Sequence, residues 1–199
     1  MTSASIRLQT CLEETTSRGQ ALERQLEKVE QETLSDNLTG LGNRRAAEQI
    51  MSELCEVYKE SGEMFSVILL DLDQFKKVND AHGHAVGDAV LCKVARSLQD
   101  NVKGRDFIAR HAGEEFTVIL PQTASGPATV VADQLREALA AKRLRIAETD
   151  EGLGSVTASF GIAEIRPDDT VHSLSERAKR ALESAKAAGG DTVKSENDL

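Results

Sequence analysis

The chain of 199 residues is poor in residue types that mark several large classes of protein. It has no tryptophan, 3% aromatic residues and three prolines. Its three cysteines, Cys11, Cys55 and Cys92, are spaced in neither a metal-ligand nor a redox motif, so reduced thiols are expected. The longest aliphatic block, residues 67–70, is far shorter than the roughly 20 residues that span a bilayer. No membrane segment is therefore expected.

An excess of positive charge is also missing. The net charge is -9, whereas proteins that bind nucleic acid usually present a basic face, and single-strand binders add stacking aromatic residues. No nucleic-acid partner is expected, although a metal ion can let an acidic pocket hold a small anion. The start, MTSASIRLQTC, has no apolar stretch typical of a secretory signal, so a cytoplasmic location is expected.

A narrow apolar stripe runs along the first thirty-odd residues. Its positions recur at alternating steps of four and three: Leu8, Leu12, Thr15, Gly19, Leu22, Leu26, Val29 and Thr33. Because the surrounding residues are almost wholly polar, a helix of this kind has no core to join and favours pairing with a copy of itself. We expect residues 1–34 to form a parallel two-stranded coiled coil. A single solvated helix is the alternative.

Residues 35–199 carry a mixed pattern of helices and strands. Helical periodicity covers 46–61, 85–102, 128–143 and 171–190, and strand-like runs cover 64–72, 105–120 and 154–165. The run 105–120 reads as two strands around a turn at residues 111–113. The order of elements predicts an α+β domain with a palm or ferredoxin-like arrangement.

Two acidic clusters follow or interrupt strand-like segments. Asp71 and Asp73 end the most apolar run, and Glu114 and Glu115 stand at the hairpin tip. A carboxylate beside a buried strand is costly unless it is paired or bound to a metal ion. Oxygen ligands without histidine or cysteine suit Mg²⁺ or Mn²⁺. The alternative is that these acids are ion-paired with the nearby basic residues Lys76, Lys77 and Arg110.

Four segments together resemble a known family. DNLTGLGNRR (36–45), DLDQFKKVNDAHGHAVGDAVL (71–91), RHAGEEF (110–116) and SFGIAE (159–164) are similar to successive signatures of the GGDEF domain of bacterial diguanylate cyclases. The resemblance covers about residues 34–199. It implies a palm/ferredoxin-like fold whose central, mostly antiparallel, five-stranded sheet is flanked by helices.

The resemblance implies an enzyme that condenses two GTP molecules into cyclic di-GMP and releases two pyrophosphates. Asp71, Glu114 and the carbonyl of Leu72 match the family's ligands for Mg²⁺ or Mn²⁺, two ions per half-site. Glu114 also matches a candidate base for the ribose 3′-hydroxyl, although metal binding alone would account for it. Glu115 matches the next catalytic acid. Two bonds require two half-sites, so the resemblance implies a homodimer, which the N-terminal coil would hold together.

The resemblance also assigns the nucleotide contacts. Asn79 and Asp88 match the guanine readers; without the family, Asp88 would be taken for a helix cap. The matched phosphate contacts are the backbone N–H groups of Gln74 and Phe75 and the side chains of Lys76 and Lys186. Gly113 matches the glycine at which the backbone approaches the nucleotide closely. An amide and a carboxylate complement the donors and the acceptor of guanine, which favours GTP over ATP.

The chain departs from the family pattern at several positions. Gly190 stands where the family usually has a phosphate-binding arginine, Ser184 lies near the place of a tyrosine, and Ala112 replaces the first glycine of the signature. These departures predict weaker GTP binding. Lys103 replaces the arginine that precedes Asp106 in the family's product-inhibition site, which predicts weak or absent feedback by cyclic di-GMP.

Two other functions are compatible with these residues. One is a catalytically weak or inactive GGDEF module that binds GTP or cyclic di-GMP and signals through a partner. The other is a cyclase or polymerase-like enzyme that uses another nucleotide.

Overall fold

The computed structural model describes residues 16, 18, 34–102, 104–145 and 152–199, and the chain divides into two compact units, Met1–Leu34 and Ser35–Leu199. Thr16 and Arg18 are helical. The remainder of the predicted coiled coil, up to residue 33, lies outside the described residues.

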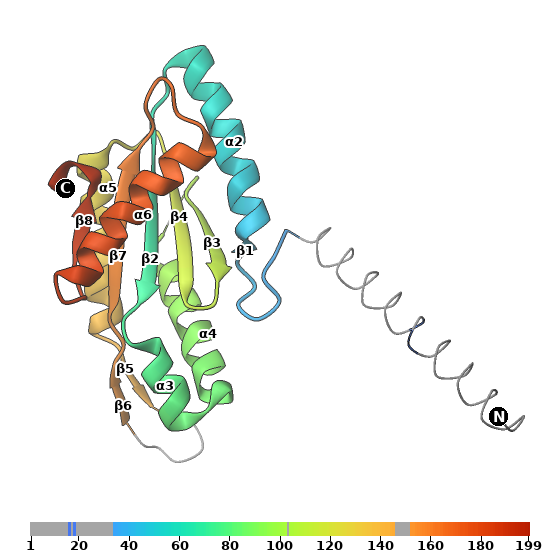
Figure 1. Cartoon of the computed structure of the whole chain (residues 1–199), viewed down its shortest axis with the longest axis vertical. Coiled ribbons are helices and arrows are strands. Elements are labelled where there is room, and N and C mark those ends of the chain that lie inside the picture. Colours follow the sequence, from blue (N-terminus) through green and yellow to red (C-terminus); the bar gives the residue numbers. More distant parts are fainter. Residues whose placement is uncertain (1–15, 17, 19–33, 103, 146–151) are drawn as a thin grey trace, which may run out of the picture. The chain divides into compact units, whose positions relative to one another are not determined.

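The second unit alternates helices and strands (Figure 1). Its elements in chain order are β1 (Gly42–Asn43), α2 (Arg44–Ser61), β2 (Phe65–Leu72), α3 (Phe75–His82), α4 (His84–Asn101), β3 (Phe107–Ala112), β4 (Glu115–Pro121), α5 (Ser125–Ala140), β5 (Arg143–Arg145), β6 (Gly152–Ser155), β7 (Ala158–Glu164), α6 (Val171–Ala187), β8 (Val193–Ser195) and the 3₁₀ helix η1 (Glu196–Asp198).

The strand β2 lies at the centre of a sheet with the order β1-β3-β4-β2-β7-β8. It is antiparallel to both β4 and β7, and its register with β4 runs from Phe65 opposite Pro121 to Asp71 opposite Glu115. Every residue of β2 except Leu69 is buried. A strand that is covered on both faces needs an apolar sequence, and FSVILLDL supplies one. Its only charged residue, Asp71, therefore stands out as a candidate functional group.

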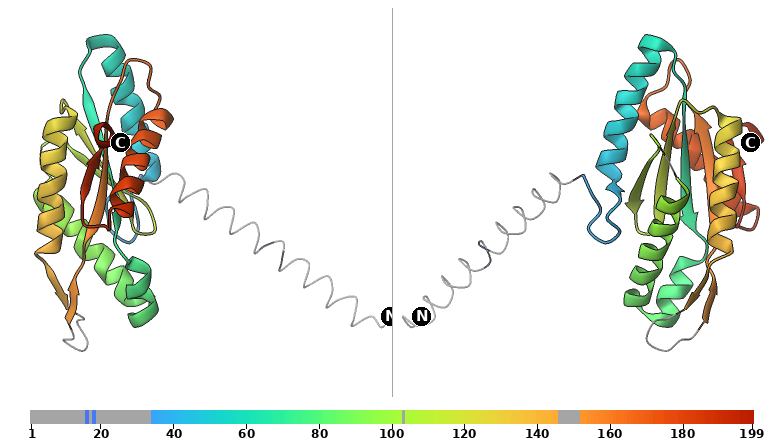
Figure 2. Two further views of the ribbon diagram at one scale, coloured as in Figure 1. Left: turned by 60° about the vertical axis from the view of Figure 1, so that its left-hand side comes forward. Right: turned by 180° about the vertical axis from the view of Figure 1, so that it is seen from behind.

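Helices cover both faces of this sheet (Figure 2). Ile68 and Leu70 pack with α4 and α5, whereas Val67 packs with α2 and α6. Because successive strand residues point to opposite faces, Asp71 belongs to the α2/α6 face together with Val67.

The helix α6 lies unusually close to β7. Gly161 of β7 has no side chain, and a Cβ atom there would lie 2.2 Å from the carbonyl oxygen of Ala178 and from the backbone nitrogen of Leu182. Any larger residue would push the helix away from the sheet. This contact brings the last turn of α6, which carries Lys186, to the carboxyl end of β2.

The α+β architecture is confirmed, with several differences in detail. The main sheet has six strands instead of the expected five: four longer strands, β2, β3, β4 and β7, and the short edge strands β1 and β8, which pair in parallel with β3 and β7. The expected strand 154–165 is divided into β6 and β7, and α3 is a separate helix before α4. The hairpin turn falls at residues 113–114 instead of the expected 111–113, because β3 extends to Ala112. In the described part of the chain, no helix is both long and apolar enough to cross a membrane.

Candidate active site

The acids predicted to act together do lie near one another at the carboxyl end of β2. Asp71 is the register partner of Glu115, and the N–H of Leu72 lies 3.4 Å from the carbonyl oxygen of Glu114, to which it donates. Asp71 is only 7% exposed. Burial raises the pKa of Asp71, the hydrogen bond and charge of Lys186 oppose this, and the charges of Glu114 and Glu115 raise it further. The net shift of the Asp71 pKa is upward, and a shifted pKa of this kind marks a candidate functional group.

Lys186 holds the carboxylate of Asp71. Its Nζ atom lies 2.7 Å from Oδ2 of Asp71. The predicted alternative partners of the acids lie elsewhere: Lys77 donates to Gln74 at 2.7 Å, and Arg110 pairs with Asp36. For Lys76, the described residues include no ion pair. The alternative in which these three cations neutralise the acids is therefore wrong.

The hairpin between β3 and β4 is fixed by its own arginine. Nε of Arg110 donates to the carbonyl oxygen of Gly113 at 2.9 Å, and Gly113 has φ +52°, a conformation that favours glycine. A register shift between Arg110 and Ala112 interrupts the regular ladder just before the turn, and Glu115 then lies between Ala112 of β3 and Asp71 of β2. The side chain of Ala112 is exposed.

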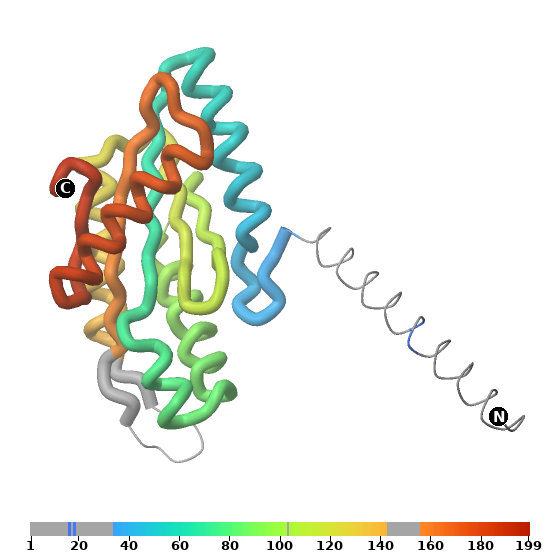
Figure 3. Tube along the Cα trace, in the orientation of Figure 1, coloured from blue at the N-terminus to red at the C-terminus, as the bar shows by residue number. Residues whose placement is uncertain are grey.

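The same arginine connects the hairpin to the segment before α2. Its Nη1 atom lies 3.3 Å from Oδ1 of Asp36, whose carboxylate also accepts from the N–H and hydroxyl of Thr39 at 2.8 and 2.6 Å. Although burial acts in the opposite direction, these hydrogen bonds and the charge of Arg110 lower the pKa of Asp36. Figure 3 shows the two segments side by side. The signature turn is thus tied to the first residues of the domain.

The loop between β2 and α3 has the backbone expected of an anion-binding turn. Gln74 is left-handed at φ 56°, a rare conformation for a residue with a side chain. It is the N-cap of α3 without a side-chain cap, Phe75 follows with a buried side chain, and Lys76 is exposed. The free N–H groups of this helix start can face a phosphate.

The two predicted guanine readers, Asn79 and Asp88, are both next to Gly87: Asn79 lies against it in space, and Asp88 follows it in the chain. Oδ1 of Asn79 is buried and has no hydrogen-bond partner among the described residues, and a Cβ atom on Gly87 would lie 1.9 Å from it. Asp88, the next residue, is exposed. The N-cap of α4 is Gly83, so the helix-cap alternative for Asp88 is wrong. An orphaned acceptor beside an exposed carboxylate fits a ligand with several N–H donors.

Sequence reasoning missed the role of Asp73. Its carboxylate accepts from the hydroxyls of Thr157 and Ser159 at 2.8 and 2.7 Å and from the N–H of Asp191 at 2.8 Å. These contacts join the loop after β2 to β7 and to the loop after α6. Gly190 has φ +82°, and a Cβ atom there would lie 2.9 Å from Oδ1 of Asp73. At the position of the family's usual arginine, this chain therefore has a glycine, Gly190, whose backbone contacts the carboxylate of Asp73.

Two further residues were predicted to lie at the family's product-inhibition site. Asp106 is half-buried and directly precedes β3, whereas Lys103 lies outside the described residues. The loss of the site's arginine therefore stays a prediction about its function.

The donor set at the end of β2 consists of oxygen atoms. The described residues include no group of three or more acidic, histidine or cysteine side chains that could hold a metal ion. Two carboxylates, Asp71 and Glu114, and the carbonyl of Leu72 are nevertheless what Mg²⁺ requires when substrate phosphates and water complete its shell. The residues present fit a metal that arrives with a nucleotide better than a metal held by protein alone.

Comparisons with known proteins agree with this geometry. The chain matches the family described as "Diguanylate cyclase, GGDEF domain" over residues 33–192. It is 38% identical to the diguanylate cyclase DgcP of Pseudomonas aeruginosa over 94% of this chain, and 36% identical to the diguanylate cyclase VdcA of Vibrio cholerae over 86%. It spans only 28% and 50% of the lengths of these two relatives.

Solved structures give the same result. The GGDEF domain of DgcB from Caulobacter crescentus, in complex with c-di-GMP, has a TM-score of 0.80 and 34% identity, with 82% of this chain and 93% of that chain covered. A structure of the coiled coil and GGDEF domain of the same protein, also with c-di-GMP, has a TM-score of 0.80 and 32% identity, with 94% and 98% covered. The chain belongs to the GGDEF family, and the family predicted from its motifs is confirmed.

Proposed function

We propose that this chain is a diguanylate cyclase, which condenses two GTP molecules into cyclic di-GMP and releases two pyrophosphates. The observation that carries the proposal is the convergence of Asp71, the Glu114–Glu115 tip and Lys186 at one end of the central strand. The names of the relatives support the same activity.

Each of the two bonds forms by nucleotidyl transfer. The 3′-hydroxyl oxygen of one GTP attacks the α-phosphorus of the other, a new O3′–P bond forms, and the bond from that phosphorus to the pyrophosphate oxygen breaks. Glu114 accepts the hydroxyl proton, and Glu115 supports the hairpin edge. Lys186 stabilises the negative charge that collects on the phosphate oxygens.

Metal dependence is part of the proposal. Asp71, Glu114 and the Leu72 carbonyl would hold Mg²⁺ or Mn²⁺, two ions per half-site. When bound, such ions stabilise charge on the attacking and leaving oxygens. The main chain at Gln74 and Phe75, together with Lys76, binds the triphosphate.

Guanine is selected by Asn79 and Asp88. The carboxylate of Asp88 accepts from N1–H and N2–H₂, and the unpaired Oδ1 of Asn79 provides another acceptor. Adenine lacks the matching pair of donors, so ATP is expected to be a poor substrate. Gly113 lets the nucleotide approach the hairpin closely.

A homodimer supplies the second half-site. The heptads of residues 1–34 would hold two domains close together and raise their effective concentration. The coverage of a relative that contains a coiled coil and a GGDEF domain supports this arrangement. In the chain of 199 residues, specific activity should be constant down to nanomolar protein, whereas a chain without residues 1–33 should lose specific activity on dilution. Equal dilution behaviour would contradict the tethering role.

The activity is tested by incubating the chain with GTP and Mg²⁺ and separating the products by chromatography. Cyclic di-GMP and pyrophosphate should appear in a ratio of one to two. Glu114→Gln should abolish both, whereas Glu60→Gln, which changes an exposed glutamate at the end of α2, should leave the rate unchanged. Turnover by Glu114→Gln at the wild-type rate would refute the proposed role of this acid.

One observation favours a second candidate, a GGDEF module that binds GTP or cyclic di-GMP without turnover. Gly190 offers no cation to the triphosphate and is enclosed by Asp73. This candidate predicts binding of GTP by calorimetry with no pyrophosphate release.

A further inference from the structure

The two segments that are proposed to contact the triphosphate come from distant parts of the chain, and one side chain joins them. The turn at Gln74 and Phe75 follows β2, and Lys186 lies in the last turn of α6. Asp73 directly precedes the turn, and its carboxylate accepts from the N–H of Asp191, in the loop after α6, at 2.8 Å. This carboxylate is therefore a point at which both segments are fixed.

The turn after Asp73 has a backbone conformation that must be held in place. Gln74 has φ 56°, in the left-handed region that residues with a side chain seldom adopt, and its side chain does not cap α3. A conformation of this kind persists where surrounding contacts impose it. The N–H of Asp73 donates to the carbonyl oxygen of Thr157 at 2.9 Å, and its carboxylate accepts from the hydroxyl of Thr157 at 2.8 Å. Both the main chain and the side chain of Asp73 therefore fix the start of the turn.

The loop after α6 also has an unusual backbone. Gly189, Gly190 and Asp191 have φ values of 115°, 82° and 44°. Glycine adopts such values at little cost, whereas an aspartate does not. Asp191 is held from two directions, because its N–H donates to Oδ2 of Asp73 and its Oδ1 atom accepts from Nη1 of Arg136 at 3.2 Å. Loss of the Asp73 carboxylate would remove the hydrogen bond that ties this loop to the turn after β2.

The surroundings of Asp73 distinguish it from a metal ligand. Its Oδ1 atom accepts from the hydroxyl of Ser159 at 2.7 Å, and its Oδ2 atom accepts from Thr157 and Asp191. These bonds use three of the roughly four acceptor positions of a carboxylate. A Cβ atom on Gly190 would lie 2.9 Å from Oδ1, so the backbone of Gly190 also lies against the carboxylate. Little of the carboxylate is left for a cation.

The negative charge of Asp73 does not favour a phosphate. The three donors to its carboxylate are two hydroxyls and one N–H, which are uncharged groups. Because like charges repel, a benefit of Asp73 to GTP binding must come from these hydrogen bonds and not from the charge. An amide side chain could make the same contacts without the charge, if the hydroxyl of Ser159 became the acceptor of one of them.

We propose that Asp73 is a positioning residue for GTP. Through its three hydrogen bonds it holds the phosphate-binding turn and the end of α6 in the relative arrangement that a triphosphate requires, and it does not bind the metal ion. The inference rests on one part of the proposed function, namely that the turn at Gln74 and Phe75 and the side chain of Lys186 contact the triphosphate.

Calorimetric titration of the chain, in the presence of Mg²⁺, with guanosine 5′-(α,β-methylene)triphosphate tests this role. In this analogue a P–C bond replaces the bond that the cyclase would break, so binding is measured without turnover. Asp73→Ala should weaken binding about tenfold. Asp73→Asn should bind within about twofold of the wild type, because its amide can replace the three contacts. Thr157→Val, which removes one of the donors, should weaken binding about threefold.

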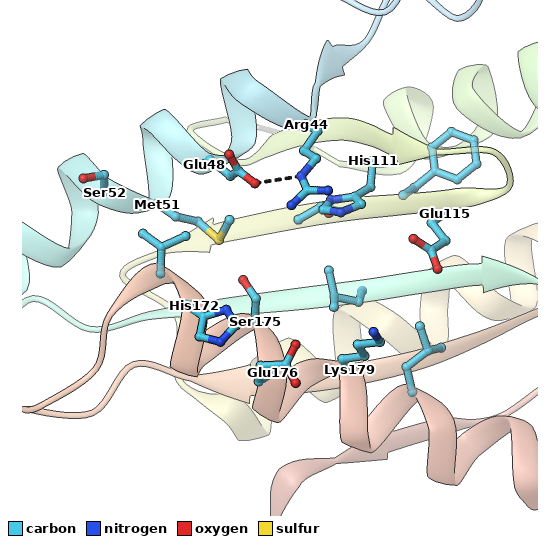
Figure 4. Close-up of a pocket in the computed structure, with 15 residues that line it drawn as sticks. Arg44, Glu48, Met51, Ser52, His111, Glu115, His172, Ser175, Glu176 and Lys179 are labelled. Carbon is cyan, nitrogen blue, oxygen red and sulfur yellow. Dashed lines mark hydrogen bonds and ion pairs between the residues drawn. The ribbon is translucent and has the colours of Figure 1, made fainter.

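Two control variants separate positioning from general effects. Glu176→Gln removes a carboxylate charge from α6, at the pocket between α2 and α6 that Figure 4 shows, and should leave binding unchanged. Ile162→Val shortens a fully buried side chain of β7, so it should lower the melting temperature without touching the turn. Its affinity for the analogue should equal that of the wild type. A loss of affinity in Asp73→Ala alone is thus not explained by charge or by reduced stability.

Several results would overturn the proposal. If Asp73→Asn binds as weakly as Asp73→Ala, the charge itself is needed, as for a metal ligand. If Asp73→Ala binds as the wild type does, the turn keeps its shape without this carboxylate. Should Asp73→Ala fail to fold, Thr157→Val decides, and wild-type affinity in that variant would refute the positioning role. Absence of binding by the wild type would overturn both this inference and the proposed function, whereas binding without formation of cyclic di-GMP from GTP would count against the proposed function alone.

Discussion

Replacement of Gly190 by arginine would restore the residue that the family usually has at this position, yet we expect it to harm the protein. The backbone at Gly190 has φ +82°, and a Cβ atom would lie 2.9 Å from Oδ1 and 3.0 Å from Cγ of Asp73. Real Cβ atoms do not approach that closely. The loop or the carboxylate of Asp73 must therefore shift, and we expect the hydrogen bond from the N–H of Asp191 to Asp73 to be lost.

The expected cost follows from two contributions. A left-handed conformation costs a residue with a Cβ atom about 1–2 kcal/mol. A hydrogen bond to a charged group contributes about 1.5–3 kcal/mol, and less where it is partly exposed, as at Asp191. A total of roughly 2–4 kcal/mol lowers the melting temperature of a domain of this size by about 5–15 °C.

Thermal unfolding by circular dichroism and the KM for GTP together test this reasoning. Gly190→Arg should melt earlier than the wild type, and its KM should not fall. Gly126→Ala provides the matched control, because nothing lies within 4 Å of a Cβ atom at Gly126 and its melting temperature should barely change. A Gly190→Arg protein that melts within 2 °C of the wild type (roughly the shift from 1 kcal/mol or less) and binds GTP more tightly would refute the argument.

Three further substitutions probe separate parts of the domain. Gly87→Ala drives a methyl group against Oδ1 of Asn79. In steady-state assays this variant should raise the KM for GTP about 10–100-fold, the equivalent of about 1–3 kcal/mol. An unchanged KM would exclude Asn79 as a guanine reader. Asp36→Asn weakens the ion pair with Arg110, which ties the hairpin to the segment before α2. It should reduce kcat roughly tenfold, about 1.4 kcal/mol in the activation barrier, with little change in KM. An unaltered kcat would show that this contact does not order the hairpin. Because burial lowers the pKa of His111 on folding, the folded state resists its protonation, so its contribution to stability is present above pH 6.5 and is lost as the pH falls below that value. Denaturant unfolding of His111→Gln should show a shallower loss of stability than the wild type from pH 6.5 downward, and identical profiles would contradict the shift.

The features that could be predicted from the sequence are those in which a local pattern and a fold requirement coincide. The apolar run before Asp71 predicted a central strand because only a strand covered on both faces needs such a sequence. The two apolar segments around Gly113 predicted a hairpin, and the structure moves its turn by only a residue or two. Asp71 and the glutamates of the tip are neighbours in the sheet for the same reason.

The contacts that escaped prediction join segments far apart in the chain. Nothing local to Asp71 indicates that its cation comes from Lys186, because that pairing depends on how closely α6 packs on Gly161. The alternative that paired Arg110 with the acids of the site is wrong, since the partner of Arg110, Asp36, lies before the first helix of the domain. The edge strands β1 and β8 have two and three residues, too few to show a period.

Asp73 illustrates the same limit most clearly. From its spacing it shares a motif with Asp71, and sequence reasoning placed it in the acidic cluster. The structure uses it to fasten three segments, through Thr157, Ser159 and Asp191. The role of a carboxylate depends on which donors surround it, and those donors are set by tertiary packing.

Strand β2 is paired along its length with β4 and β7, and this pairing fixes the backbone position of Asp71 at its end. A shift of one residue would move every side chain of β2 to the opposite face and take Asp71 away from the α2/α6 face, so the position of Asp71 is fixed as soon as the sheet has formed. A half-site that cannot be reshaped can still be kept from its counterpart. In the homodimer that we propose, control is therefore expected to act on how often, and in what orientation, the two copies meet.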